Sequence, residues 1–281
     1  MIFLLFLWGT SALASVSNVQ SLSVGGIDLG NLRIFVGQDS TQKKNSLDAL
    51  KVEYTSIVDK FSTDVQAVEE EINAIKKRID GMKQRARTTL PQHQELYAKE
   101  LSYINKIHQS LLDIKESRMR ALDIMKQHIE FLETYFENPE SVLQEIPKKS
   151  LYAFSDLYTV TKYVYEEEDE IARISVKKQE LEDFLSKESL DEKEKEKRAK
   201  EIDSSIENLR LSGKTDISYN VQVLDVAKEV NTIEQRLIRS KINEYQRSVD
   251  FIDSKLFVYQ ECLKTYKNTL GSIHAKLRIS K

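Results

Sequence analysis

The chain has 281 residues, of which 31% are charged, and its formal net charge is −3. This nearly balanced charge gives the whole chain no general attraction to nucleic acids or anionic membranes. Proline occurs only three times and glycine eight times, and most of the glycines precede residue 40. Because turns depend on these two residues, the rest of the chain is predicted to consist of long elements with few corners. The abundance of Lys, Glu and Leu predicts that these elements are α-helices.

The N-terminal segment is typical of a secretory signal peptide. An apolar run from Ile2 to Trp8 is followed by small residues at Ala12 and Ala14, which suit the −3 and −1 positions of a cleavage site. The run is too short to span a bilayer as a mature helix. No Lys or Arg precedes it, so a retained membrane anchor is the alternative. We expect residues 1–14 to be removed near Ala14, leaving a secreted or extracytoplasmic protein of the periplasm, cell surface or extracellular space.

Residues 15–45 differ in composition from everything that follows. They are rich in Ser, Gly and Asn, with one short β-prone run at Leu32–Val36. We interpret this segment as a tether. A lone strand is not stable without a partner, so the run is expected to be disordered alone or to pair with another strand on binding.

Residues 46–137 are predicted to form a long helical hairpin. In the first helix apolar residues recur at alternating spacings of three and four, which is a heptad seam. One additional four-residue step, from Phe61 to Val65, is a stutter that locally relaxes the supercoil. The seam consists of Leu47, Leu50, Tyr54, Ile57, Phe61, Val65, Val68, Ile72, Ile75, Ile79 and Met82.

The second helix of this hairpin is predicted from about Pro91 to Glu137, because proline suits the first turn of a new helix. Arg118 stands where its seam requires an apolar residue, and this arginine either selects the helix register or snorkels outward. The short joint makes the two helices antiparallel neighbours, about 60–70 Å long. The seam consists of Ile104, Ile107, Leu111, Ile114, Leu122, Met125, Ile129, Leu132 and Phe136.

Residues 138–149 contain the other two prolines and are predicted to be a joint. A third helix should follow from Ser150 to about Lys187, with a weak apolar stripe. Tyr158 and Tyr165 lie off this stripe; they either flank the core or form a face for another helix or a membrane. The stripe consists of Phe154, Leu157, Val164, Ile171, Ile174, Leu181 and Leu185.

Residues 150–281 are expected to hold two more helices, three in all. Ser189 and Glu192 have the spacing of a capping box, which predicts that a fourth helix of about 20 residues starts there. Gly213 is well placed to cap its C-terminus. A final helix of roughly 60 residues should run from about Tyr219 to near the end.

The final helix carries the most regular seam of the chain. Just before this seam the three–four spacing of apolar residues is shifted by one residue, between Leu237 or Ile238 and Ile242. A 20-residue fourth helix would be too short to cover this seam, so the surplus is a candidate surface for binding a partner or a second copy. The seam consists of Ile242, Tyr245, Val249, Ile252, Leu256, Tyr259, Leu263, Tyr266, Leu270, Ile273 and Leu277.

A basic cluster in residues 76–87 departs locally from the balanced charge. Cations at the end of a helix complement its dipole, and this is the simplest interpretation. The alternative is contact with an anionic surface. The cluster consists of Lys76, Lys77, Arg78, Lys83, Arg85 and Arg87.

No catalytic, cofactor or metal site is expected. The four histidines lie far apart in the sequence, and the single Cys262 cannot form an internal disulfide. Cys262 is interpreted as a small core residue, with a disulfide between two copies as the alternative. The acids of residues 165–170 spread around a helix and are interpreted as a solvated face rather than a calcium site.

Taken together, these patterns predict an all-α, elongated bundle of long antiparallel coiled-coil helices behind a short irregular N-terminal segment. The expected function is that of an exported, non-enzymatic scaffold or interaction protein, such as an arm of a cell-envelope or surface assembly. Its expected partner is another protein or a second copy, not nucleic acid. A membrane-binding or membrane-shaping helical module is the alternative, followed by an enzyme.

Overall fold

The computed structural model describes residues 40–85, 93–137, 146, 148–212 and 218–277. They form four long helices and no strand beyond one isolated bridge between Tyr152 and Leu277. This confirms the predicted all-α bundle. The longest helix has 59 residues, or about 88 Å. The helices are α2 (Ser40–Arg85), α3 (Gln94–Glu137), α4 (Phe154–Leu211) and α5 (Ser218–Lys276).

The predicted signal peptide and the β-prone run lie outside the described residues. So do Pro91 and Gly213, at the predicted joints. The predicted end of the tether at residue 45 is wrong, because α2 begins at Ser40. Residues 40–45 contain neither Gly nor Pro and include Gln and Lys, which favour helix, so the helix extends across them.

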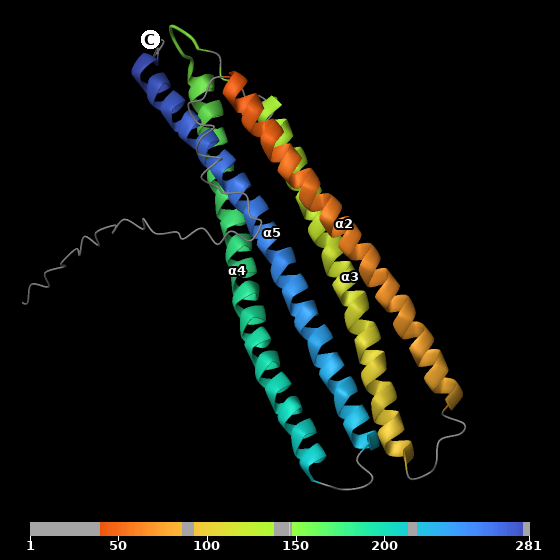
Figure 1. Cartoon of the computed structure of the whole chain (residues 1–281). Coiled ribbons are helices and arrows are strands. Elements are labelled where there is room, and N and C mark those ends of the chain that lie inside the picture. Colours follow the sequence, from red (N-terminus) through yellow and green to blue (C-terminus); the bar gives the residue numbers. More distant parts are fainter. Residues whose placement is uncertain (1–39, 86–92, 138–145, 147, 213–217, 278–281) are drawn as a thin grey trace, which may run out of the picture.

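The four helices lie side by side in the order α4, α5, α3, α2 across the lower half of Figure 1. Successive helices run in opposite directions, and α2 packs on α3 while α4 packs on α5, which confirms the predicted antiparallel pairs. The two hairpins are joined by contact between α3 and α5. Toward the upper end of Figure 1 the α4–α5 pair leans away from the α2–α3 pair.

The interior consists of three apolar clusters. The first is shared by α2, α3 and α5, and we call it the three-helix core; it includes Val68, Ile72, Ile79, Ile104, Ile107, Leu111, Ile114, Val226 and Val230. The second lies between α2 and α3 around Tyr54, Met125 and Leu132. The third lies mainly between α4 and α5, around Val160, Val164, Val258, Cys262, Tyr266 and Ile273. The predicted seams of α2 and α3 are buried or half-buried wherever their side chains are described.

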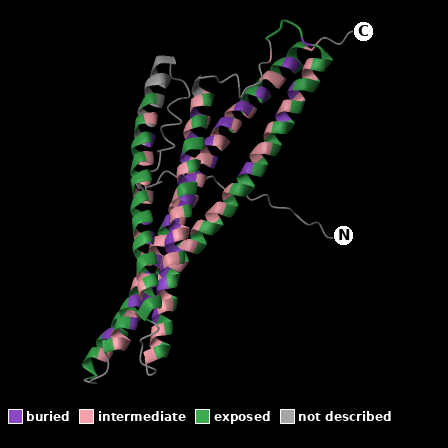
Figure 2. Ribbon diagram, turned by 90° about the vertical axis from the view of Figure 1, so that its right-hand side faces the viewer, coloured by how far each residue is buried: buried purple, intermediate pink, exposed green. Residues whose placement is uncertain are grey.

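The α4 helix is covered on one side only. Its buried residues are Val160, Val164, Ile174 and Ile206, whereas α5 buries residues along its whole length. Figure 2 shows this contrast as exposed residues along the outer side of the molecule and buried ones where helices face each other. The predicted stripe of α4 is confirmed except at Phe154, which is 75% exposed.

The predicted break at Ser189 is wrong, since α4 is continuous from Phe154 to Leu211 and residues 150–281 hold two helices, not three. The Ser189 hydroxyl donates to the carbonyl of Leu185 at 2.8 Å, as it does inside a helix. The Glu192 carboxylate accepts from Arg239 of α5 at 2.6 Å. Both side chains of the apparent capping box therefore have other partners. Packing against α5 stabilises the helical conformation of α4 on both sides of Ser189.

Replacing Leu190 by proline tests this continuity. A proline directly after an N-cap is tolerated, whereas in a helix interior it removes a backbone hydrogen bond and costs about 3 kcal/mol or more. We expect Leu190→Pro to lower the free energy of unfolding in urea by about this amount. Leu190→Ala is the control: the side chain is 65% exposed, so its loss should change stability little. Equal stability of the two variants would contradict the continuous helix.

Candidate functional site

The first features to place are the metal-binding, membrane-spanning and cysteine groups of the described residues. No group of three or more His, Cys, Asp or Glu residues is placed there to hold a metal ion. None of the four helices carries an apolar stretch long enough to cross a membrane. Cys262 is 1% exposed, and burial, with help from nearby Glu167 and Glu261, raises the pKa of its thiol to about 12. This confirms Cys262 as a core residue, and a disulfide to a second copy would require the helices to part.

A buried polar chain links α2, α3 and α5, and the sequence pattern did not reveal it. The Tyr54 hydroxyl lies 2.8 Å from Nδ1 of His128, and Nε2 of His128 lies 2.7 Å from the Ser254 hydroxyl. Ser254 in turn donates to the backbone carbonyl of Asp250 at 3.0 Å. The residues are 74 and 126 positions apart in sequence, so only the packing of the three helices brings them together.

The geometry and burial of this chain are those of a structural network. If Ser254 gives its proton to the Asp250 carbonyl, as its 3.0 Å contact allows, the matching tautomer of His128 donates from Nε2 and accepts at Nδ1. A catalytic histidine would instead accept the serine proton. All three side chains are at most 2% exposed, so no substrate reaches them. The chain is therefore a structural network that satisfies buried polar groups.

The predicted partner-binding seam of α5 faces the interior of the protein. All eleven of its residues are buried or half-buried. Tyr245 stacks on Phe184 of α4 with ring centroids 5.5 Å apart, and Tyr266 lies 5.5 Å from the ring of Tyr163. The argument for a surplus rested on a 20-residue fourth helix and is wrong, because α4 with 58 residues matches α5 with 59.

The basic cluster lies at the C-terminal end of α2. Lys83 and Arg85 are in its last turn, where they complement the helix dipole, while Arg87 lies outside the described residues. Arg78 turns toward α5 and forms an ion pair with Glu229 at 2.8 Å. Lys76 and Lys77 are exposed. The basic residues therefore do not all lie on one surface, because Arg78 pairs with α5 while Lys76 and Lys77 face the solvent. Contact of the cluster with an anionic surface stays a prediction.

The outward side of α4, which we call the α4 stripe, carries five exposed apolar residues. Their spacings of 4, 7, 11 and 14 residues are close to whole helical turns, so they lie within about 40° of one another around the axis. The stripe extends over about 54 Å. Its members and exposed fractions are Phe154 (75%), Tyr158 (71%), Tyr165 (68%), Val176 (62%) and Leu190 (65%).

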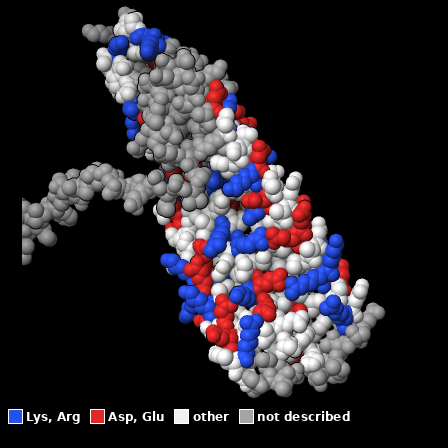
Figure 3. Space-filling model, viewed as in Figure 1, with Lys and Arg blue, Asp and Glu red and all other residues white. Residues whose placement is uncertain are grey.

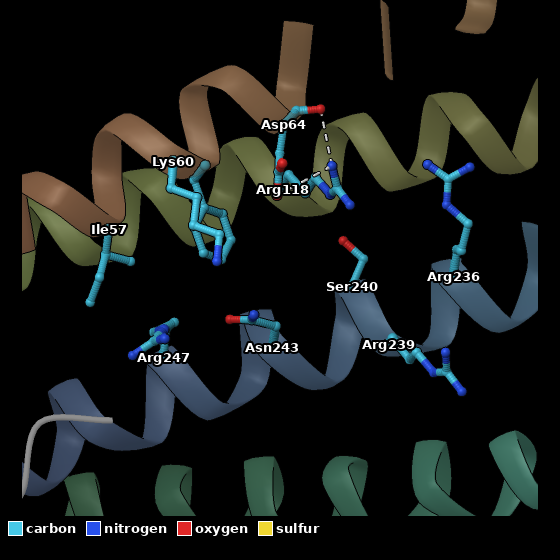
Figure 4. A pocket seen from close by; sticks show the side chains of 10 residues that line it. Ile57, Lys60, Asp64, Arg118, Arg236, Arg239, Ser240, Asn243 and Arg247 are labelled. Atoms are coloured by element: carbon cyan, nitrogen blue, oxygen red, sulfur yellow. Dashed lines mark hydrogen bonds and ion pairs between the residues drawn. The ribbon is translucent and has the colours of Figure 1, made fainter. Parts of the chain in front are cut away.

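A second feature is a cavity of about 380 Å³ at the upper boundary of the three-helix core, which we call the fork pocket. It lies between α2, α3 and α5, and Figure 4 shows that basic side chains from all three helices surround it. Asp64 is its single acidic lining residue. The basic lining residues are Lys60, Arg118, Arg236, Arg239 and Arg247.

Charges over the rest of the visible surface are mixed. On the face seen in Figure 3, Lys and Arg alternate with Asp and Glu along the helices. Many charged residues of the bundle form ion pairs between helices, for example Lys178 with Asp253 at 2.7 Å and Lys267 with Glu168 at 2.7 Å. The fork pocket departs from this pattern because its lining is predominantly of one sign.

Acidification should destabilise the protein through His128. Burial, with help from the nearby charges of Arg247 and Lys255, lowers the pKa of this histidine to about 4 from an ordinary 6.5. The unfolded chain therefore binds the proton first as the pH falls from 6.5 to 4, and stability is lost across this window. The loss at pH 4.5 is about 2–3 kcal/mol relative to pH 7.

Urea unfolding of the protein and of His128→Gln at both pH values measures this effect. The variant is expected to be less stable at pH 7 because the hydrogen-bond chain is broken, yet to lose about 2–3 kcal/mol less on acidification. An identical pH dependence in both proteins would show that His128 is not the responsible group.

Comparison with known proteins assigns no family to this chain. No protein-family model, no curated protein and no solved structure matches it. The function proposed below rests on the geometry and chemistry of its own residues.

Proposed function

We propose that this protein is a non-enzymatic helical scaffold that binds a protein partner, or a second copy, through the α4 stripe. The observation that carries the proposal is the exposure of five large apolar side chains in one line on a helix that has a helical neighbour on one side only. Apolar residues scattered singly on a surface need no explanation, but several large ones aligned on one side of a helix are typical of an interaction site. Exposed Glu168 and Asp183 lie on the same side of α4, so the apolar contacts alternate with charged positions.

The length of the bundle supports the same proposal. The α4 and α5 helices have 58 and 59 residues and extend over about 88 Å, so one molecule can bind partners at well-separated points along its length. Inter-helix ion pairs and the three apolar clusters fix the relative positions of the four helices. The proposed export, by the apolar N-terminal segment, would place this scaffold at the cell envelope or outside the cell.

The neighbours of the α4 stripe favour a protein over an anionic membrane. Tyr165 is followed by exposed Glu166, Glu168 and Asp169, which anionic lipid headgroups would repel. Tyrosine and phenylalanine supply large contact areas at protein interfaces, and the acids would form a polar rim around them.

Site-specific photocrosslinking in the native compartment tests this function. A photoreactive residue at Tyr165 or Val176 is expected to crosslink to a protein. The matched controls are Glu166 and Lys177, each one residue further along and therefore turned by about 100° around the helix. Both control positions are exposed, so they differ from the test positions in direction only.

Crosslinks at Tyr165 and Val176 without crosslinks at the two controls would support the α4 stripe as the binding face. Equal yields at all four positions, or lipid adducts alone, would contradict it. Mass spectrometry of the adduct distinguishes a second copy from a different partner.

A further inference from the structure

We propose that the fork pocket is a binding site for a small phosphate-bearing anion. This inference is independent of the α4 stripe, because the pocket lies between α2, α3 and α5. The cavity of about 380 Å³ falls in the usual range of ligand sites and exceeds the space of one water molecule about tenfold.

The pocket forms at one height along the bundle, where the heptad spacing of apolar residues is interrupted in all three helices. The stutter of α2 lies between Phe61 and Val65, the apolar seam of α3 is interrupted by Arg118, and α5 shifts its seam between Leu237 and Ile242. The lining residues lie at these three places or within about two helical turns of them. Below this level α5 shares an apolar core with α2 and α3. Above it the buried apolar residues of α5 cluster mainly with α4, while Phe251 still packs against His128 and Phe131 of α3.

Arg118 spans the pocket from α3 to α2. Its guanidinium donates to the backbone carbonyl of Asp64 at 3.0 Å, and the Asp64 carboxylate lies 3.9 Å away. The arginine is therefore held between the helices, which agrees with a register-selecting role rather than outward snorkelling. A guanidinium has five N–H donors, so this geometry leaves donors for a ligand.

The other arginines are oriented by carboxylates that lie outside the lining. Arg236 forms a bidentate pair with Glu71 at 2.7 and 3.0 Å, and Arg239 donates to Glu192 at 2.6 Å. The contact of Arg247 with Asp250 is longer, at 3.7 Å. Arg236 is thus fixed toward α2, whereas the Arg239 guanidinium turns toward α4 and lines the cavity with the rest of its side chain. Side chains fixed by such partners are a feature of preorganised sites.

Lys60 adds a positive charge that no carboxylate balances. It makes no ion pair with any described residue, and Figure 4 shows its ammonium group directed from α2 toward α5 across the pocket. The lining has five cations. The acids that pair with its four arginines within 4 Å include Asp64, Glu71, Glu192 and Asp250. Two of these pairs, Arg118 with Asp64 at 3.9 Å and Arg247 with Asp250 at 3.7 Å, are too long for hydrogen bonds.

Ser240 is an independent indication of a ligand. Its side chain is 8% exposed, and its hydroxyl has no hydrogen-bond partner. Ser248 and Ser254 of the same helix bond the carbonyl four residues earlier, so the Ser240 hydroxyl departs from the local pattern. In Figure 4 it points away from α5 into the pocket toward Arg118. A buried hydroxyl without a partner costs stability, and a bound oxyanion would accept its proton.

A phosphate group matches this lining best. It presents several oxygens to donors arriving from different helices, and planar guanidinium groups bind it with paired hydrogen bonds. The volume leaves room for a second phosphate or an organic substituent beside it. Both a soluble phosphate compound and a lipid headgroup supply this chemistry.

Calorimetric titration of the full chain with pyrophosphate, at constant ionic strength, tests the proposal. We expect saturable binding that Lys60→Gln weakens about five- to tenfold, through the loss of one charge-assisted bond. Ser240→Ala should also weaken binding, while leaving the melting temperature of the free protein unchanged or higher because an unsatisfied hydroxyl is removed. Asp64→Asn should tighten binding by removing the one repelling lining charge.

The matched control is Lys197→Gln, which removes the same charge from an exposed site outside the pocket, where the lysine forms only a 4.0 Å pair with Glu201. Unchanged affinity in this variant, with weaker binding in Lys60→Gln, would support the site. Equal weakening in both would show general charge attraction, and no saturable binding up to about 10 mM would exclude a useful site; either result overturns the proposal.

Vesicles of phosphatidylcholine with and without phosphatidic acid identify the source of the phosphate. Binding only to the phosphatidic acid vesicles, lost in Lys60→Gln, would support the site with a lipid headgroup as its ligand. Binding of pyrophosphate but not of vesicles would support a soluble ligand. Self-association that Lys60→Gln abolishes would mean that acidic side chains of a second copy fill the pocket, and would overturn the proposal.

Discussion

The packing of α5 against helices on two sides is the interaction on which the rest of the structure depends. The helix contacts α3 from one hairpin and α4 from the other. Glu234 shows this double role within one side chain, since it pairs with Lys106 of α3 at 2.5 Å and with Lys195 of α4 at 2.6 Å. Without α5, the α2–α3 pair and α4 would have no common core.

This arrangement explains why a pocket and a polar network occur where they do. As α5 turns from α2 toward α4, the apolar seams of three helices no longer meet, and polar side chains occupy the space between them. At this level the fork pocket is lined by arginines. Beyond it, His128 connects Tyr54 to Ser254 and satisfies polar groups that the same divergence buries. Departures from regular packing thus coincide with the places where specific chemistry is available.

The α4 helix and the fork pocket divide the proposed roles of the molecule. The α4 helix gives one face to α5 and leaves the other for a partner, because no further helix among the described residues covers it. The pocket opens between the remaining three helices, and its basic lining suits a small anion rather than a large apolar surface. Binding at one site need not interfere with binding at the other, and each is tested by its own substitutions.

The sequence by itself determined the helical class, the antiparallel pairs and the identity of most core residues, because heptad spacing specifies which side of a helix is apolar. It could not decide whether α4 breaks at Ser189. The same S-x-x-E sequence is found in a capping box and in a continuous helix whose Ser and Glu side chains bond to other groups, as Ser189 and Glu192 do here. The Phe61–Val65 stutter, Arg118 and the shift after Leu237 were each visible in the sequence. That they meet at one level depends on how three helices align, and helix alignment is set by contacts between residues far apart in the chain. Likewise, periodicity placed Tyr158 and Tyr165 off the core stripe, but only the packing order of the helices decided that this side remains exposed.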